Sequence, residues 1–264
     1  MTPPTTSRAR HHRRTLGLLA TALTGALALG IDGALVSPAT AAPAPHATVS
    51  LSGWNLTLPV DSSGCQCGDA AQLSPAAIDS PWLTRDSSGA LVFWAPTKGA
   101  TTPNSAHPRT ELVSTSSFSG DSSGTHTLSA TLSVQQLPPA NDIIVGQIHG
   151  GGSSSSIPLL MLHYASGSLT VWVRPTPSTG SQKVATVLTG VPLNTSFSYK
   201  ITETGSSMKV SVTYGSKTGS STIALGSGFD GMNLRFQAGD YQQSDANSSS
   251  TEGGKMTITA LSQS

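Results

Sequence analysis

Short runs in which apolar and polar residues alternate dominate the chain from residue 53 onward, and they restrict the possible folds more than any other feature. Clear examples are GWNLTLPV at 53–60 and HTLSATLSV at 126–134. A period of two places the apolar side chains on one face of a β-strand. Clusters of Gly, Ser, Asn and Pro separate the runs, as they do between antiparallel strands. We therefore predict an all-β domain, an antiparallel β-sandwich.

Local patterns predict individual elements of this sandwich. One hairpin is expected to turn at residues 165–168 and another at 204–207, because alternating runs flank a Gly-containing turn in both places. Residues 255–262 are expected to form the last strand. A short helix is expected around 74–79, where Pro75 suits a first helical turn.

The N-terminus has the pattern of an export signal. Four arginines between positions 8 and 14 precede an apolar run from Leu16 to Leu29, and the small residues 39–41 follow. This pattern predicts a secretory signal peptide over residues 1–41 and a single extracellular domain over 42–264. Arg13 and Arg14 leave open whether export follows the ordinary or the twin-arginine route.

Charge and cysteine content exclude several classes of function. Residues 42–264 carry 10 basic and 12 acidic side chains, a net charge of −2 without a Lys/Arg run, so nucleic acid is not an expected partner. Beyond the signal no stretch approaches a membrane span, and we expect a monomer. Cys65 and Cys67 are expected to be bridged or free in a surface loop. No metal site is expected there, because two thiolates do not supply four ligands.

Three segments place reactive side chains two residues apart, the spacing of residues on one face of a strand. They are Arg109 with Glu111 in HPRTEL, Gln147 with His149 in GQIHG, and Gln237, Tyr241 and Gln243 in RFQAGDYQQ. A guanidinium, an amide, an imidazole and a phenol are the groups needed to remove a proton beside a carboxylate and to protonate a leaving oxygen.

The ordered motifs HPRTEL, QIH and FQAGDYQQ, with GWNLTLP near the mature start, resemble those of the alginate lyases of polysaccharide lyase family seven. The resemblance covers nearly the whole mature chain. It implies a β-jelly roll with an open cleft on its concave sheet. It also implies cleavage of an acidic polysaccharide by β-elimination without a metal or another cofactor. Ile148, between Gln147 and His149, is associated within the family with guluronate-containing blocks.

The chemistry of β-elimination assigns a role to each group. The proton on C5 of a 4-linked uronate is too weakly acidic unless donors stabilise the adjacent carboxylate, and Arg109 and Gln147 are expected to do so. His149 suits the general base, and Tyr241 the acid that protonates O4 or, for one C5 stereochemistry, the base itself. Glu111 is expected to orient Arg109. The predicted substrate-binding residues are His107, Glu111, Arg235, Gln237 and Gln243.

The motifs also depart from the family pattern. Val113 and Gln237 stand where the family usually has arginine and lysine, and Arg235 stands where it usually has tyrosine, so two expected cations are missing. A glucuronan lyase on the same fold therefore stays open as an alternative.

Two other classes of protein are disfavoured. A non-catalytic carbohydrate-binding module would need an aromatic platform, whereas Trp82, Trp94 and Trp172 are expected to be buried. A glycoside hydrolase would need two carboxylic acids flanking the scissile bond. Glu111 is the only carboxylate in the motifs on the expected face, because Asp240 would point away from Tyr241.

Overall fold

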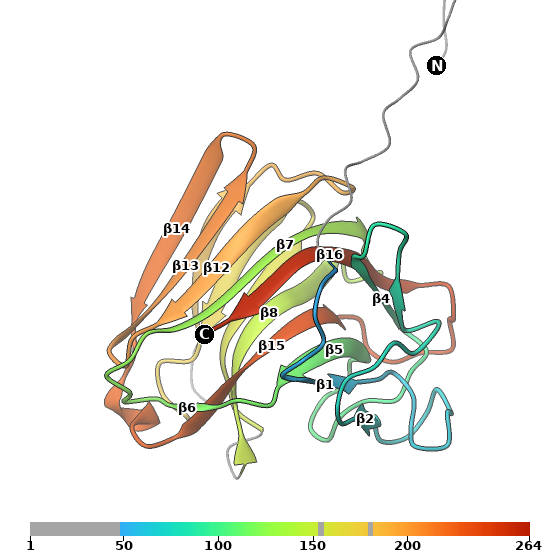
Figure 1. Ribbon diagram of the computed structural model, residues 1–264, viewed down its shortest axis with the longest axis horizontal. Coiled ribbons are helices and arrows are strands. Elements are labelled where there is room, and N and C mark those ends of the chain that lie inside the picture. The colour runs from blue at the N-terminus through green and yellow to red at the C-terminus, as the bar shows by residue number, and fades with distance from the viewer. Residues whose placement is uncertain (1–47, 153–155, 179–181) are drawn as a thin grey trace, which may run out of the picture. The chain divides into compact units, whose positions relative to one another are not determined.

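The computed structural model describes residues 48–152, 156–178 and 182–264, which form two antiparallel sheets around one hydrophobic core (Figure 1). The predicted signal peptide, residues 1–41, lies outside the described residues. Within the described ranges there is no α-helix, although Ser227–Phe229 forms a 3₁₀ turn, η2. In this part of the chain, therefore, no helix has the length and apolarity to cross a membrane. The predicted all-β fold is confirmed.

The nine-stranded sheet carries the motif residues. Its strands in spatial order are β11 (Lys183–Thr189), β10 (Ser168–Val173), β9 (Pro158–Ala165), β8 (Asp142–Gly150), β15 (Asn233–Gln242), β5 (Arg109–Ser114), β1 (Trp54–Thr57) and β2 (Gln72–Leu73), and β6 (Phe118–Ser119) also pairs with β15. The order shows that β15, near the C-terminus, lies between two strands from the middle of the chain.

The seven-stranded sheet closes the other side of the core. Its strands in spatial order are β14 (Lys217–Ala224), β13 (Ser207–Tyr214), β12 (Phe197–Glu203), β7 (His126–Gln136), β16 (Gly253–Gln263), β4 (Leu91–Pro96) and β3 (Leu83–Arg85). The predicted C-terminal strand is confirmed as β16, which pairs with both β7 and β4.

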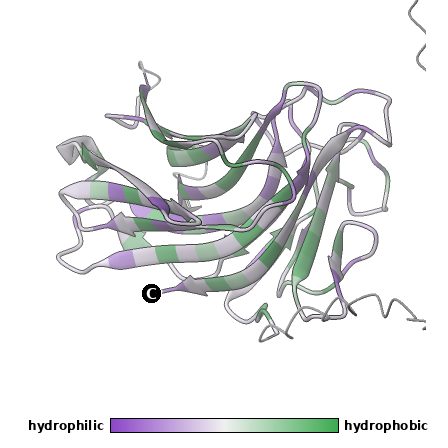
Figure 2. Cartoon of the chain, turned by 90° about the horizontal axis from the view of Figure 1, so that it is seen from above, coloured by the Kyte–Doolittle hydropathy of each residue, from purple (hydrophilic) through white to green (hydrophobic). Residues whose placement is uncertain are grey.

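The predicted alternation accounts for the core between the sheets. On β7, Leu128 and Leu132 are fully buried, while the polar residues between them are partly exposed. Apolar and polar segments accordingly alternate along the strands in Figure 2. Each fully buried Leu, Val or Phe side chain contributes about 1.5–3 kcal/mol relative to exposure. Both predicted hairpins are confirmed, since Ala165 pairs with Ser168 and Glu203 pairs with Met208.

The predicted helix at 74–79 is wrong. The Ala76 amide donates to the Trp54 carbonyl (2.8 Å) and the Asp79 amide to the Leu83 carbonyl (2.9 Å). These backbone donors are satisfied by other segments of the fold, so a helical ladder does not form. The expected burial of Trp82, Trp94 and Trp172 is also only partial. The ring of Trp172 stacks on that of His163 with 4.4 Å between their centroids.

Candidate active site

The three motif segments become neighbouring strands of the nine-stranded sheet, in the order β8, β15 and β5. Tyr241 on β15 lies opposite Arg109 on β5, and Gln237 lies opposite Gln147 on β8. Arg235, two residues before Gln237, lies opposite His149. Because residues opposite one another point to the same side of a sheet, these six side chains share one face.

Gly239 allows β15 to approach β5 closely. Ala238 pairs with Gly146 and Tyr241 with Ile144, so β15 has one extra residue against β8, a β-bulge. Gly239 within this bulge has φ of 147°. A Cβ atom there would lie 2.7 Å from the Thr110 carbonyl oxygen and 2.9 Å from Glu111 Cα. Glycine is therefore required where the strand that carries Tyr241 passes the strand that carries Arg109.

A cleft of about 350 Å³ lies over this face. Seven of the nine predicted site residues line it: Arg109, Glu111, Gln147, His149, Arg235, Gln237 and Tyr241. Arg109 and Gln147 are only 7% and 1% exposed, yet they border the cleft, so they belong to its floor and not to the apolar core. The predicted guanidinium, amide, imidazole and phenol thus share one cleft.

Glu111 ties the floor of the cleft together. Its carboxylate, which is fully buried, accepts hydrogen bonds from Arg109 Nη1 (3.2 Å) and Gln147 Nε2 (2.5 Å). Burial raises the pKa of Glu111, and the charge of Arg109 and the hydrogen bond from Gln147 oppose that rise. Glu111 thus contacts Arg109, and its role in orienting the guanidinium stays a prediction.

Gln147 is more constrained than the sequence indicates. Its Nε2 also donates to Gln237 Oε1 at 3.0 Å, so both amide hydrogens have protein acceptors. In this structure Gln147 therefore reaches a substrate carboxylate only by releasing Glu111 or Gln237.

Arg109, Tyr241 and Ser105 form a second cluster in the cleft. The guanidinium carbon of Arg109 lies 3.4 Å from the centroid of the Tyr241 ring, a cation–π contact. Ser105 Oγ is 2.9 Å from the Tyr241 hydroxyl and accepts a hydrogen bond from Arg109 Nη2 (3.3 Å). The phenol is thus held both by its ring and by its oxygen.

His149 has the properties of a base that is neutral near physiological pH. Nδ1 lies 3.1 Å from the Gly150 carbonyl oxygen, which only accepts, so Nδ1 carries the proton and Nε2 keeps its lone pair. Burial lowers the pKa of His149 to about 4. The charges of Arg109, Arg235 and Arg174 act in the same direction, while the hydrogen bond to Gly150 opposes them.

The two remaining predicted residues stand beside the cleft and are not part of its lining. His107 precedes β5, and its Nδ1 lies 3.3 Å from Asp245 Oδ1 without forming a hydrogen bond. Its ring centroid is 6.2 Å from that of Tyr241. Gln243 follows the end of β15, and its Nε2 donates to the carbonyl of Tyr241 (3.1 Å). Their contact with substrate stays a prediction.

Several lining residues were missed by the sequence analysis. They are Thr57, Gln72, Thr102, Pro103, Asn104, Ser105, Ser156, Pro158, Met161 and Arg174. Ser105 lies only four residues before Arg109, but in a loop, where the period of two gives no signal. Arg174 follows β10, which lies two strands from β8, and this position in the sheet is not evident from the sequence. Arg174 and Arg235 provide cations in the cleft although Val113 and Gln237 do not.

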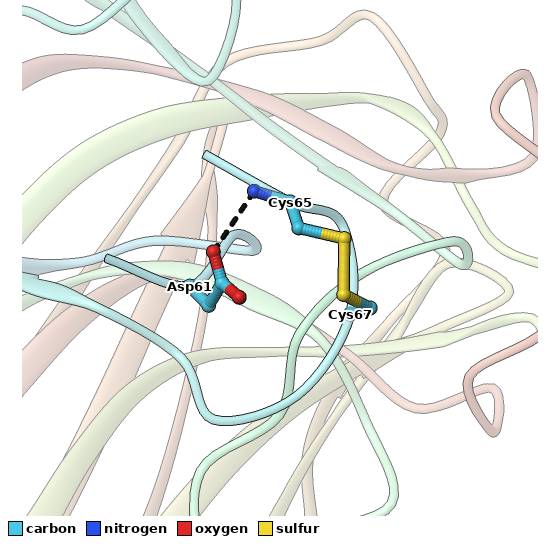
Figure 3. A group of neighbouring side chains, drawn as sticks. All are labelled: Asp61, Cys65 and Cys67. Carbon is cyan, nitrogen blue, oxygen red and sulfur yellow. Dashed lines mark hydrogen bonds between the residues drawn. A yellow bond between two sulfur atoms is a disulfide. The ribbon is translucent and has the colours of Figure 1, made fainter. Parts of the chain in front are cut away.

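Among the described residues, one cluster of side chains of the types that bind metal ions is found. It lies in the loop that contains both cysteines and consists of Asp61, Cys65 and Cys67 (Figure 3). The two sulfurs form a disulfide, so neither is available as a thiolate ligand. The Asp61 carboxylate accepts hydrogen bonds from the amides of Ser63 (2.8 Å) and Cys65 (2.9 Å). Hydrogen bonds lower the pKa of Asp61, and the hydrogen bond from the Ser63 hydroxyl has the largest effect.

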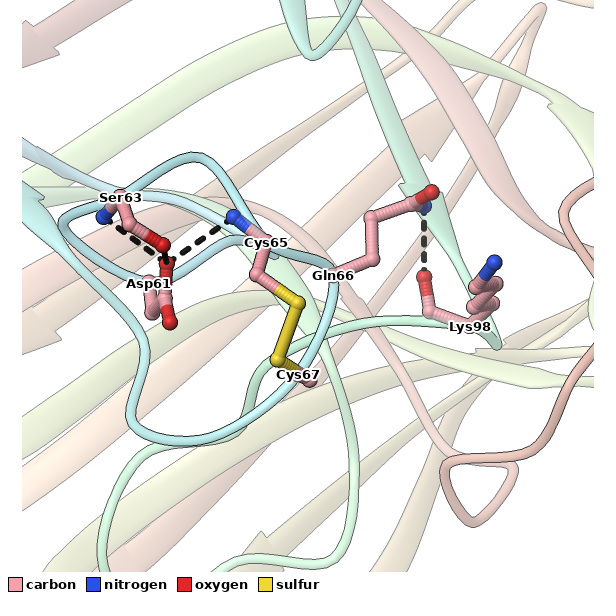
Figure 4. Close-up of a disulfide and its surroundings, with 6 residues drawn as sticks. All are labelled: Asp61, Ser63, Cys65, Gln66, Cys67 and Lys98. Carbon is pink, nitrogen blue, oxygen red and sulfur yellow. Dashed lines mark hydrogen bonds between the residues drawn. A yellow bond between two sulfur atoms is a disulfide. The ribbon is translucent and has the colours of Figure 1, made fainter.

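This loop supports one wall of the cleft. Gln66 Nε2 donates to the Lys98 carbonyl at 2.7 Å (Figure 4). Asp69 forms a bridge with Thr101, immediately before the lining residue Thr102. These contacts indicate that the loop has a structural role and helps to position the segment that leads to Ser105.

Comparisons with known proteins agree with the geometry. The model of a family described as alginate lyase matches residues 49–264. An alginate lyase of Klebsiella pneumoniae is 28% identical over an alignment of 269 positions, which covers 77% of this chain and 85% of that protein. The crystal structure of a Pseudomonas aeruginosa alginate lyase superposes with a TM-score of 0.71 at 31% identity, covering 81% of this chain and 99% of the other.

A variant of a family 7 alginate lyase solved in complex with a product, GGG, is 28% identical. It superposes with a TM-score of 0.70 and covers 82% of this chain and 96% of its own. The family match spans the described sandwich and all three motif strands. The chain belongs to the alginate lyase family and is a polysaccharide lyase with a jelly-roll fold.

Proposed function

We propose that this protein is a secreted enzyme that cleaves alginate, with guluronate-containing blocks as preferred sites, by β-elimination without a metal. One observation carries the proposal: Arg109, Gln147, His149 and Tyr241, from three adjacent strands, line a single cleft. The disulfide Cys65–Cys67 supports secretion, because disulfides persist in oxidising compartments.

The first requirement is stabilisation of the uronate carboxylate while C5 loses its proton. Arg109 is held by Glu111 and Ser105 on the floor of the cleft, and its Nε has no hydrogen-bond partner among the described residues. A guanidinium fixed in this way offers paired donors to a carboxylate. Preorganised donors of this kind contribute about 10²–10³ in rate.

The second requirement is proton transfer. His149 Nε2 takes the proton from C5, the electron pair forms the C4–C5 double bond, and the C4–O4 bond breaks as the Tyr241 hydroxyl protonates O4. The lowered pKa of His149 keeps Nε2 unprotonated at neutral pH. His149 serves the substrate whose C5 proton lies opposite the leaving group, and Tyr241 alone serves the same-side case.

Support for the substrate class comes from the relatives. Two variants of one family 7 alginate lyase have been solved in complex with a product, GGG, and with a substrate, GGMG. The resemblance associates Ile148 with guluronate, although its side chain is fully buried in the core. Any effect of Ile148 on selectivity must therefore act through the position of Gln147 and His149.

Hydrolysis is disfavoured by the placement of the carboxylates. Glu111 is committed to Arg109 and Gln147, and Asp240 is fully buried on the opposite side of β15. A Cβ atom at Gly254, on β16 of the other sheet, would lie 2.1 Å from Asp240 Oδ1, which places this carboxyl between the sheets. Burial raises the pKa of Asp240 well above its usual range. No described pair of carboxylates thus flanks the cleft.

The test is an assay on polyguluronate, polymannuronate and glucuronan in the presence of a chelator. A rise in ultraviolet absorbance from the unsaturated uronate, fastest on polyguluronate, is expected. Reducing ends without absorbance indicate hydrolysis, binding without turnover indicates a carbohydrate-binding module, and cleavage of glucuronan alone indicates a glucuronan lyase. Each of these three results would refute the proposal.

A variant of His149 tests whether His149 and Tyr241 act as bases on different substrates. His149→Ala is expected to reduce cleavage of polyguluronate far more than cleavage of polymannuronate, whereas equal losses on the two polymers contradict the assigned roles. His163→Ala is a matched control, since His163 bonds Asp142 on the same sheet but does not line the cleft.

A further inference from the structure

Two arginines that the elimination step does not use lie on either side of His149. Arg235 on β15 is directly opposite His149 on β8. On the other side of His149, Pro158 is its partner on β9, and the Arg174 amide donates to the carbonyl of the next residue, Leu159 (2.9 Å). The three cationic or potentially cationic residues therefore form one row across the strands.

The row is short enough for the two arginines to act together. Arg235 and Arg174 lie three strand spacings apart, about 14 Å between backbones in a flat sheet. Both side chains line the cleft, as does that of His149. Both charges also act on His149, since each contributes to lowering its pKa. Two extended arginine side chains reaching inward from these positions can approach the same group above His149.

Neither guanidinium has a partner in the described protein. Nε of Arg174 and Nε of Arg235 are buried without a hydrogen bond, and neither side chain has an ion pair among the described residues. Arg109, in contrast, bonds Glu111, and Arg85 bonds two backbone carbonyls (2.6 and 2.8 Å). Burial lowers the pKa of Arg235, and the charge of Glu111 opposes that shift. A bound anion would provide the missing partner.

We propose that Arg174 and Arg235 form a second carboxylate subsite, which holds the uronate next to the one whose carboxylate Arg109 binds. This inference rests on the proposed function and assigns the cations that bind the polymer. Arg109 on β5 and Arg174 on β10 are four strand spacings apart, about 19 Å in a flat sheet, so one sugar ring does not span both. Arg109 lies level with Tyr241, six residues from Arg235 along β15, so the polymer runs diagonally over the sheet, from β5 toward β10.

The test compares Arg174→Gln and Arg235→Gln with Lys200→Gln, which removes an exposed charge on β12 of the other sheet. On polyguluronate, each arginine variant is expected to raise KM about tenfold or more with little change in kcat, the effect of losing a charged hydrogen-bonded contact. The dependence of KM on salt should also weaken in both arginine variants. Lys200→Gln should leave KM unchanged.

Two measurements separate a binding role from a structural one. Because an unpartnered buried charge costs free energy, Arg235→Gln should unfold at the same temperature as the wild type or higher. In a Tyr241→Phe background, calorimetry with a guluronate oligosaccharide should show the same loss of affinity. If the wild type cleaves polyguluronate but both arginine variants keep its KM, the second subsite is refuted. If the wild type cleaves no polyuronate, the proposed function itself fails.

Discussion

Replacing Gly239 by alanine is expected to damage both stability and catalysis, because the glycine lies where β15 passes β5. The new Cβ would meet the Thr110 carbonyl oxygen at 2.7 Å, Glu111 Cα at 2.9 Å and Phe93 Cε1 at 3.2 Å. Two of these atoms are backbone and cannot rotate away. Overpacking costs about 1–3 kcal/mol and a non-glycine residue at this φ about 1–3 kcal/mol more, so we expect a loss of about 2–6 kcal/mol in the free energy of unfolding.

Gly215→Ala is the matched control. Gly215 also has a positive φ, 57°, but a Cβ atom there would have no neighbour within 4 Å. Gly215→Ala carries the backbone penalty, about 1–2 kcal/mol, and the same loss of conformational freedom in the unfolded chain, but the new Cβ collides with nothing. Urea unfolding measures the free energy of unfolding of both variants, and initial rates on polyguluronate measure the effect on the active site.

The loss of kcat/KM in Gly239→Ala is expected to be separate from its loss of stability. Relief of the collision must move β5, and with it Arg109, relative to Tyr241. A displacement near 1 Å reduces kcat/KM about 10²-fold, while Gly215→Ala, on the other sheet, should leave it unchanged. Equal destabilisation by the two substitutions would refute the close approach. A destabilised Gly239→Ala with wild-type turnover would refute its link to the site.

Three further predictions concern single groups in the cleft. Tyr241→Phe keeps the ring against Arg109 but removes the acid, so kcat should fall about 10²–10⁴-fold. The control Tyr214→Phe, on β13, should have no effect on kcat. A kcat of Tyr241→Phe within a few-fold of wild type would exclude the acid role. Ser105→Ala removes the contact to the phenol and should lower kcat about 2–10-fold, with recovery in Ser105→Thr; no recovery would indicate a purely steric role. The base requires neutral His149, so kcat/KM on polyguluronate should fall as pH drops through a pKa near 4; an acid limb at 6.5 or above would contradict it. In the unfolded chain His149 titrates near its ordinary value, so its contribution to stability is complete above about pH 6.5 and declines toward pH 4.

Some of the site was predictable because strand periodicity is a local property. Arg109 and Glu111, two residues apart, share a face in any strand, as do Gln147 and His149. The same rule placed Asp240 on the opposite side from Tyr241, where the structure buries it. The failed helix at 74–79 shows the limit of local reasoning, since hydrogen bonds to Trp54 and Leu83 overrode the helical signal of Pro75.

The sequence by itself determined the all-β class, the faces of the three motif strands and the chemical groups that those faces carry. Only the tertiary structure decided that β15 lies between β5 and β8, which brings Tyr241 opposite Arg109 and Arg235 opposite His149. It also brought Ser105 and Arg174 into the cleft. The physical reason is that a residue's face follows from the bonds of its own strand, whereas strand adjacency depends on hydrogen bonds and packing between segments far apart in the chain.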